Sequence, residues 1–197
     1  MAGREFHDGA KDGLEALEPL DPEKIRSFSE LLEAMRKTAF GGRRLGEAYE
    51  TLAAMIEDPE CKVVLTLSGA MTIAKMGKII STMIDRGMVQ AIVSTGALVA
   101  HGLSESVGKL HYRHEPSHSD EELFQKGYNR VYDTLEMESN LNYVEHVVSQ
   151  TMKRINAEQP LSSNYLTREL GKTLAEEFEG PGILKSAYLK NVPVYIP

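Results

Sequence analysis

The chain has 197 residues, of which 42% are hydrophobic, a length and composition that fit one globular domain and exclude a wholly disordered chain. Its 22 Lys and Arg against 29 Asp and Glu give a net charge of −7, which argues against a nucleic-acid binder because such proteins need a basic face. No hydrophobic run reaches the roughly 18 residues of a membrane span, the first residues lack a hydrophobic signal core, and the single cysteine, Cys61, excludes an intrachain disulfide. We therefore expect a cytoplasmic protein that binds neither nucleic acid nor membrane.

The N-terminal third is predicted to be helical after a loose start. Residues 1–21 are polar and contain glycine, so we expect a flexible N-terminal arm and treat residues 22–197 as one domain. Asp21 and Pro22 are typical of a helix start, and hydrophobic residues then recur at helical spacing. Gly41 and Gly42 are expected to end this first helix, and a second helical pattern follows them.

Two short hydrophobic runs rich in β-branched residues follow, at residues 62–67 and 88–93. Each is typical of a strand that is buried on both faces. A helical pattern between them ends at Gly87, a residue type that commonly follows the last turn of a helix. Strand, helix and strand in this order predict a right-handed crossover and a parallel sheet.

The remaining residues continue the alternation. A polar loop is predicted at residues 111–120, helices at 120–126, 141–155, 166–178 and 183–189, and a third strand at 192–196. A parallel sheet needs helices on both faces, and three strands with this many helices resemble half of a larger domain. The fold predicted is therefore α/β, a Rossmann-like parallel sheet with flanking helices that is incomplete. An exposed hydrophobic edge at residues 192–196 would favour a missing half, and a covered, charged edge would favour a self-sufficient module.

The two segments that follow the first two strands are candidate binding loops. Residues 68–72 (Ser-Gly-Ala-Met-Thr) and 94–97 (Ser-Thr-Gly-Ala) combine small residues with hydroxyl groups at strand-to-helix junctions. Backbone N–H groups at such junctions can bind a phosphate, although a tight turn with an ordinary helix cap has the same composition. Neither loop contains the GxGxxG pattern or the Walker lysine of the standard nucleotide-binding motifs.

Several histidines and one asparagine are further candidates. His111, His114 and His118 have spacings of three and four, but Pro116 interrupts any helix that would align them, so we interpret them as part of a polar surface loop and predict no metal. His101 lies just beyond the second loop and could face the same ligand as the loops. Asn129 belongs to a polar group at residues 127–133, which is typical of a capped turn before a helix.

Five short segments occur in an order that is similar to one known family. They are residues 66–72 (TLSGAMT), 85–90 (DRGMVQ), 93–103 (VSTGALVAHGL), 127–133 (GYNRVYD) and 192–197 (VPVYIP). The order resembles the deoxyhypusine synthase family, in particular its prokaryotic deoxyhypusine synthase-like branch. The resemblance runs from Thr38 to Pro197 and covers the N-terminal half to three-fifths of a family member.

This resemblance implies a Rossmann-like fold, NAD as cofactor and a homotetramer with active sites between subunits. It also implies that NAD removes a hydride from spermidine and that the aminobutyl group then passes to a protein lysine, or to putrescine in some relatives. Carried over by position, Ser68, Gly69, Ala70 and Thr72 match the first NAD-contacting loop, and Ser94, Thr95, Gly96 and Ala97 match the second. We also assign His101 to cofactor binding and Asn129 to substrate binding.

The chain departs from the family pattern at two places. Eukaryotic members have an Asn where this chain has Gly69-Ala70, and a Glu pair where it has Ala100-His101. The family's amine-binding acidic residues and its imine-forming lysine correspond to positions beyond Pro197, so we assign no catalytic residue here. Two interpretations stand: a fragment or complementary half of an aminobutyltransferase, which we favour, or a non-catalytic homologue that binds a partner subunit. The interpretation as a fragment or half predicts that the chain alone binds NAD weakly or not at all.

Overall fold

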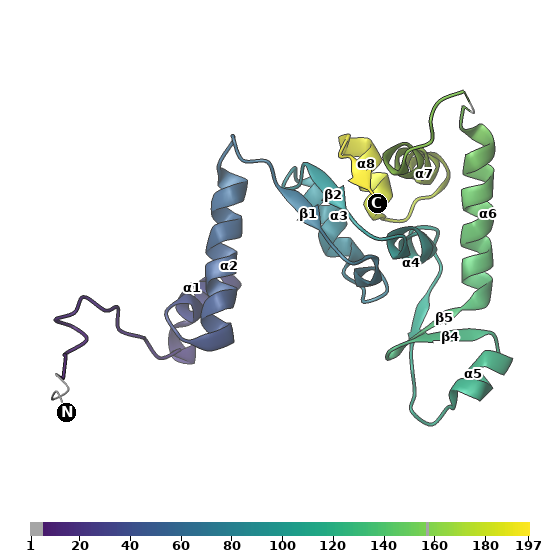
Figure 1. Cartoon of the computed structure of the whole chain (residues 1–197). Helices are drawn as coiled ribbons and strands as arrows, with labels where there is room; N and C mark the ends of the chain where they lie inside the picture. The colour runs from purple at the N-terminus through teal and green to yellow at the C-terminus, as the bar shows by residue number, and fades with distance from the viewer. Residues whose placement is uncertain (1–5, 157) are drawn as a thin grey trace, which may run out of the picture. The chain divides into compact units, whose positions relative to one another are not determined.

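The structure is a computed structural model that describes residues 6–156 and 158–197. It divides into two compact units, one that ends at Cys61 and one from Lys62 to Pro197 (Figure 1). This division falls inside the range that the sequence assigns to a single domain. Of the predicted flexible arm, residues 1–5 lie outside the described residues, and the flexibility of the remainder stays a prediction.

The first unit is a pair of helices, α1 (Phe28–Arg36) and α2 (Phe40–Glu57), after a single 3-10 turn, η1 (Pro22–Lys24). The helix predicted to begin at Pro22 begins instead at Phe28, because the Ser27 side chain accepts a hydrogen bond from the Glu30 N–H and so caps the helix there. Gly41 and Gly42 were expected to end a helix, but they lie in the first turn of α2.

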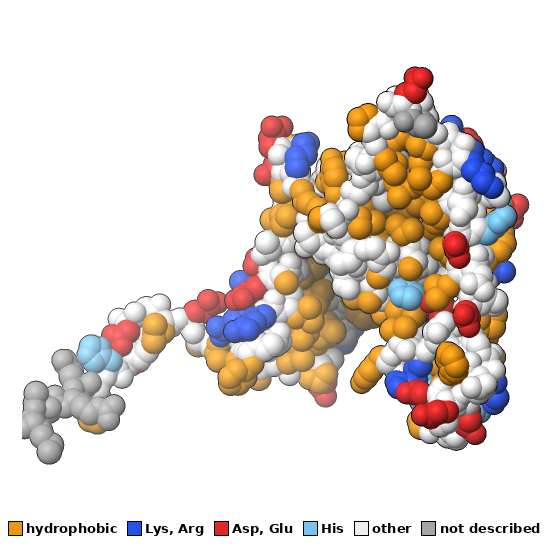
Figure 2. Space-filling model, turned by 45° about the vertical axis from the view of Figure 1, so that its right-hand side comes forward, with side chains coloured by type: hydrophobic (Ala, Val, Ile, Leu, Met, Phe, Trp, Pro, Cys, Tyr) orange, Lys and Arg blue, Asp and Glu red, His pale blue; other side chains and the backbone are white. Residues whose placement is uncertain are grey.

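Glycine also sets where the two helices of this unit meet. A Cβ atom at Gly46 would overlap the backbone of Leu32 and Arg36 on α1, so only glycine allows this close approach. No hydrophobic side chain of α1 or α2 is buried, and Phe28 and Phe40 are 87% and 92% exposed. Figure 2 shows hydrophobic side chains at the surface of these helices.

The second unit is built on the predicted parallel sheet. Its strands are β1 (Val64–Thr66), β2 (Ala91–Val93) and β6 (Val194–Tyr195), in the order β1-β2-β6, and both pairs are parallel. A 3-10 turn, η2 (Gly69–Met71), and helix α3 (Gly77–Asp85) connect β1 to β2. The predicted strand–helix–strand unit is therefore confirmed.

The connection from β2 to β6 contains five helices: α4 (Ala97–Ser106), α5 (Asp120–Gln125), α6 (Glu138–Arg154), α7 (Ser163–Glu177) and α8 (Ile183–Lys190). Inward side chains of α4, α6, α7 and α8 form one hydrophobic core with α3 and the sheet, and its almost fully buried members include Ile84, Ile92, Leu98, Leu170 and Leu174. Among the described residues, no helix is long and hydrophobic enough to cross a membrane.

Only one face of the parallel sheet belongs to this core. Side chains alternate between faces along a strand, and the register places Leu65, Ile92 and Val194 on the core face, where the latter two are almost fully buried. Thr66, Val93 and Tyr195 share the opposite face with Val64, which is 54% exposed. The prediction that the first strand is buried on both faces is therefore wrong, because the described helices pack on one face only.

A second, antiparallel sheet was not predicted. It consists of β3 (His111–Arg113), β4 (Tyr128–Val131) and β5 (Thr134–Met137), in the order β3-β5-β4. The polar loop expected at 111–120 thus begins with a strand, and the turn expected at 127–133 is mostly a hairpin strand. Polar residues at inward positions, Glu136 above all, disguise the hydrophobic alternation that normally identifies such strands.

Candidate functional site

Both predicted binding loops lie together at the carboxyl ends of β1 and β2. An open cavity of about 520 Å³ is present there. Its lining contains no charged side chain and consists of Thr66, Leu67, Ser68, Val93, Ser94, Thr95, Gly96 and Pro197. Ligands of open α/β sheets bind outside the carboxyl ends of the strands, so this cavity is where the fold itself places a ligand site.

The first loop is held tightly against the second. The Gly69 N–H donates a hydrogen bond of 3.1 Å to the Thr95 hydroxyl, and the buried Thr72 hydroxyl donates one of 2.7 Å to the Gly69 carbonyl. A Cβ atom at Gly69 would overlap the backbone of Ala97 and Leu98 at the start of α4. Glycine is therefore required for the loop to pack against this helix, whatever ligand is bound.

The second loop presents unused hydrogen-bonding groups. Ser94 is 5% exposed and its hydroxyl has no partner among the described residues, although burial of an unpaired hydroxyl is costly. In the described chain, the N–H groups of Gly96 and Ala97 also make no hydrogen bond, and they stand at the N-terminus of α4, where the helix dipole favours an anion. This donor set fits the phosphate and hydroxyl groups of a dinucleotide.

A buried carboxylate contacts α4 beyond the loops. Glu136 of β5 is fully buried and accepts hydrogen bonds from the Ser104 hydroxyl at 2.7 Å, from His101 Nδ1 at 2.6 Å and from His111 Nε2 at 3.1 Å. Lys75 Nζ lies 3.0 Å from His111 Nδ1, and because an ammonium only donates, His111 carries its proton on Nε2.

His101 connects this cluster to the loops. Its neighbours on α4, Ala97 and Gly102, face Gly69 and Thr72 of the first loop, so His101 lies on the same side of the helix. The hydrogen bond that His101 donates to the Glu136 carboxylate raises the pKa of His101 above its ordinary value, an effect that burial partly offsets. Its Nδ1 is engaged, its Nε2 has no partner among the described residues, and 22% of the side chain is exposed.

The charge of Glu136 is stabilised by the same contacts. Burial raises the pKa of this carboxyl, but the hydrogen bonds from His101, His111 and Ser104 outweigh burial and lower the pKa to about 2. Glu136 is therefore ionised at neutral pH, and this buried carboxylate accepts one hydrogen bond from each of two imidazoles. This arrangement can hold one imidazole in a fixed tautomer, with its second nitrogen free to exchange a proton.

Asn129 and the histidines after β3, the other candidates from the sequence, lie away from the cavity at the two loops. Asn129 is on β4, paired in register with Glu136, and not at the carboxyl ends of the parallel strands. His114 and His118 are in the segment after β3, where His114 Nε2 lies 3.4 Å from the His118 carbonyl, and His111 belongs to the Glu136 cluster. Within the described ranges, no three His, Cys, Asp or Glu side chains are placed to hold a metal.

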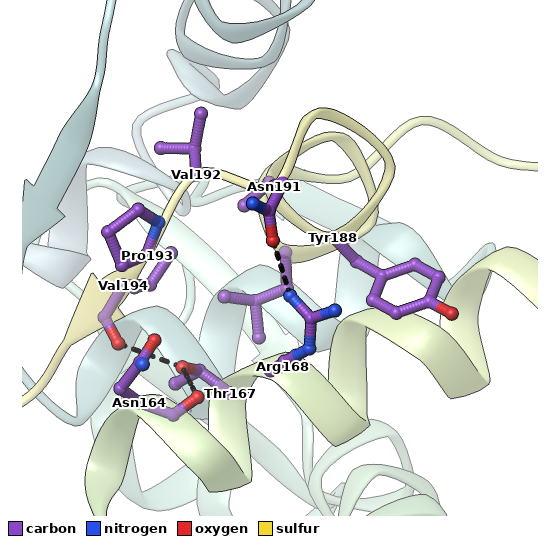
Figure 3. Close-up of a pocket in the computed structure, with 10 residues that line it drawn as sticks. Asn164, Thr167, Arg168, Tyr188, Asn191, Val192, Pro193 and Val194 are labelled. Atoms are coloured by element: carbon purple, nitrogen blue, oxygen red, sulfur yellow. Dashed lines mark hydrogen bonds between the residues drawn. The ribbon is translucent and has the colours of Figure 1, made fainter.

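A further pocket of about 220 Å³ lies at the amino-terminal side of β6, away from the loops (Figure 3). The Thr167 hydroxyl donates to the Val194 carbonyl at 2.8 Å, and Arg168 donates to the Asn191 side chain at 2.7 Å. The guanidinium also stacks over the Tyr188 ring. These polar groups are satisfied by one another, so the pocket offers a ligand few free partners.

The sequence did not reveal Glu136 or Ser104. Glu136 lies 25 residues from His111, 32 from Ser104 and 35 from His101, so no local spacing connects them. The one usable signal was His101 itself, whose position after the second loop predicted that it belongs to the site.

The three-stranded parallel sheet with helices packed against it defines an α/β protein, and in open sheets of this class ligands bind at the carboxyl ends of the strands, where the two loops lie. The family model described as deoxyhypusine synthase matches residues 30–197. The chain belongs to the deoxyhypusine synthase family, as its sequence motifs predicted.

Similar proteins agree in name but are longer. The chain is 36% identical over 182 residues to a "probable deoxyhypusine synthase 2" of Methanosarcina acetivorans. This alignment covers 91% of this chain and 52% of that protein. The chain is 30% identical over 186 residues to a "deoxyhypusine synthase-like protein" of Elusimicrobium minutum, with 93% and 49% covered. The chain thus spans about half the length of the curated relatives it matches.

A solved structure supports the fold. A crystal structure assigned to deoxyhypusine synthase from Entamoeba histolytica superimposes with a TM-score of 0.61 at 14% sequence identity. The superposition covers 92% of this chain and 64% of that one. At this identity the likeness concerns the fold, and it confirms the predicted α/β architecture.

Proposed function

We propose that the protein to which this chain contributes transfers the aminobutyl group of spermidine to an amine, with NAD as the hydride carrier. The acceptor is a protein lysine or a small amine such as putrescine. The observation that carries this proposal is the pair of loops at the carboxyl ends of β1 and β2, with the unpartnered Ser94 hydroxyl and the free amides of Gly96 and Ala97 in one open cavity.

Different residues of this chain would bind different parts of NAD. The start of α4 would hold the pyrophosphate of NAD, and the hydroxyls of Ser68, Ser94 and Thr95 would bind its phosphate or ribose oxygens. Gly69, Ala70, Thr72, Gly96 and Ala97 shape the loops that approach it. Bound NAD would accept a hydride from the substrate amine and later return it.

His101 is proposed to stand at the inner end of this site. Glu136 holds its Nδ1 proton, so its Nε2 can accept a proton from a bound ammonium group before the hydride leaves. Asn129, on the neighbouring antiparallel sheet, is kept as a proposed substrate contact. The family's imine-forming lysine and amine-binding acidic residues are proposed to come from the half of the protein that this chain does not span.

The proposal therefore requires further polypeptide, supplied as a complementary half or within a homo-oligomer such as a tetramer. Two observations support this requirement. The chain spans about half the length of its relatives, and the sheet face that carries Val64, Thr66 and Tyr195 is exposed. We place the reaction in the cytoplasm, because the single cysteine, Cys61, suits a reducing compartment.

A reconstitution assay tests this function. The chain is mixed with the half of the Methanosarcina acetivorans relative that it does not match, and spermidine, putrescine and NAD are added. We expect release of 1,3-diaminopropane, detected by mass spectrometry, because transfer of the aminobutyl group leaves this diamine behind. Omission of NAD should abolish release. A complex that forms but releases no diamine with NAD would contradict the proposed activity and favour a non-catalytic, partner-binding homologue.

A further inference from the structure

The hydrogen bonds of the buried Glu136 carboxylate continue through His111 to the surface of the chain. His111 lies on β3 with 1% of its side chain exposed, and its Nε2 donates to Glu136 Oε1 at 3.1 Å. Its other ring nitrogen, Nδ1, lies 3.0 Å from Nζ of the exposed Lys75. Lys75 Nζ also lies 3.3 Å from the Glu105 carboxylate on α4. An unbroken series of hydrogen bonds therefore joins a surface ammonium to the ring of His101.

Lys75 is held in a backbone conformation that lysine rarely adopts. Its φ of 66° lies in the left-handed region. Two hydrogen bonds tie this turn to the first binding loop: the Lys75 N–H donates to the Thr72 carbonyl at 2.9 Å, and the Met76 N–H donates to the Met71 carbonyl at 3.0 Å. A non-glycine residue kept in this region is a reason to look for a specific role of its side chain.

The charges of this cluster favour the uptake of a single proton. Its titratable and charged groups are Lys75 before α3, His101 and Glu105 on α4, His111 on β3 and Glu136 on β5. Among the described residues, no other charged side chain forms a hydrogen bond or ion pair with them. With both imidazoles neutral, two carboxylates face one ammonium. One imidazolium would balance this excess of negative charge.

Lys75 determines which imidazole takes up that proton. An ammonium only donates, so Nδ1 of His111 must remain an unprotonated acceptor, and a second positive charge beside Lys75 would be repelled. His101 has no such neighbour, because its Nδ1 donates to Glu136 and its Nε2 has no partner among the described residues. The raised pKa of His101, whose largest cause is the hydrogen bond to Glu136, agrees with uptake at this ring.

We propose that Lys75 and His111 are positioning residues that direct the single proton of this cluster to Nε2 of His101. Lys75 keeps His111 neutral, and His111 then occupies one oxygen of Glu136 and leaves the other for His101. The importance of this arrangement for the reaction rests on the proposed function, in which His101 accepts a proton from the substrate amine. The arrangement itself needs neither NAD nor spermidine, so it can fail independently of the proposed activity.

An NMR titration of the full chain tests the assignment. The nitrogen-15 shifts of the two ring nitrogens show which of them carries a proton, and the variants His101→Gln and His111→Gln identify the two rings. In the wild-type chain, Nδ1 of His111 should remain unprotonated while Nε2 of His101 takes up its proton. Uptake at Nδ1 of His111 before or together with His101 would overturn the inference, and this measurement needs no variant at Lys75.

Lys75→Met distinguishes a positioning role from the effect of a nearby charge. Loss of a positive charge alone would raise the pKa of His101. Under the proposal, Nδ1 of His111 becomes free to take up the proton, Glu136 is balanced from that side, and His101 titrates at a pH lower by about 0.5 or more. Lys78→Met in the first turn of α3 is the matched control, because the Lys78 side chain makes no hydrogen bond or ion pair within the described chain. It should not lower the pKa of His101.

Two further variants separate this role from structural damage. Lys75→Arg keeps a group that only donates and should retain the wild-type titration of His101. When Lys75→Met is combined with His111→Gln, the glutamine amide still donates to Glu136 but cannot take up a proton, so His101 should titrate at the wild-type pH or above it. The inference is overturned if Lys75→Met leaves the His101 titration unchanged or raises it. It is also overturned if the double variant titrates as low as Lys75→Met alone.

Discussion

At the scale of single residues, the electrostatics of the candidate site depend on Glu136. The carboxylate is buried, yet its pKa lies near 2 because His101, His111 and Ser104 donate to it. Sequence reasoning found His101 from its place after a strand and a loop, but it could not find Glu136, whose partners are brought to it only by the packing of β5 against α4. A single glutamate between Leu135 and Met137 gives no local sign of burial.

Glu136→Gln should therefore lower both the pKa of His101 and the stability of the chain. Glu136 has a pKa of about 2 instead of 4.5, so its contribution is present above pH 4.5 and is lost as the pH falls towards 2. The variant should cost on the order of 3 kcal/mol at pH 7 and clearly less near pH 2. The contribution linked to His101 is present below pH 6.5 and is lost as the pH rises through its raised pKa.

Urea unfolding at pH 7 and pH 2.5 measures the first effect, and the titration of the His101 ring by NMR measures the second. Ser104→Ala removes one donor while the carboxylate and both imidazoles remain, so it should cost less than Glu136→Gln. An unchanged titration of His101 in Glu136→Gln would contradict the assigned hydrogen bond.

Two glycines of the binding loops offer a matched test of loop packing. A Cβ atom at Gly69 would overlap the backbone at Ala97 and Leu98, whereas a Cβ atom at Gly96 would have no atom within 4 Å. We expect Gly69→Ala to destabilise the chain by about 1–3 kcal/mol and Gly96→Ala to change it by less than about 1 kcal/mol. Thermal unfolding followed by circular dichroism compares them. Equal losses would contradict the close approach of the first loop to α4.

At the scale of elements, the parallel strands and the helices could be predicted because their hydrophobic patterns are strong and their ends carry turn residues. The second strand, for example, contains Ile92 in a continuous hydrophobic run, and Gly87 before it ends α3 with a positive φ of 74°. The antiparallel sheet could not be predicted, since its strands mix polar and charged with hydrophobic residues, and β3 pairs with β5 only over a long separation in sequence. The start of α1 was misplaced because Ser27 caps it six residues after Asp21.

The contact between α1 and α2 gives a prediction at this scale. Gly46→Ala places a methyl group against the α1 backbone at Arg36, so the two helices must separate. Gly41→Ala, in the same helix, meets no atom within 4 Å and should stabilise α2 by up to about 1 kcal/mol, because alanine favours helix over glycine. Hydrogen exchange of the α1 and α2 amides in the full chain should accelerate in Gly46→Ala and slow in Gly41→Ala. Slower exchange in both would show that Gly46 is not a packing glycine.

At the scale of the whole molecule, the sequence offered the edge at residues 192–196 as the feature that distinguishes a missing half from a self-sufficient module. The structure meets neither outcome in full, because this edge is covered by Ser163 and Thr167 but carries no charged side chain. The uncovered edge is β1, together with the sheet face that carries Val64.

The open cavity at the two loops leads to a prediction about the strength of NAD binding. One side of the cavity is open, so the isolated chain should bind NAD weakly or not at all, and the addition of the unmatched half of the Methanosarcina acetivorans relative should strengthen binding at least tenfold, which is about 1.4 kcal/mol. In that complex, Ser94→Ala should weaken binding because its hydroxyl is the buried group without a partner. Ser81→Ala is the matched control, since Ser81 is equally buried but already donates to Lys78 within α3. Isothermal titration calorimetry measures each case. Micromolar binding by the isolated chain would show that these two loops form a sufficient NAD site without further polypeptide.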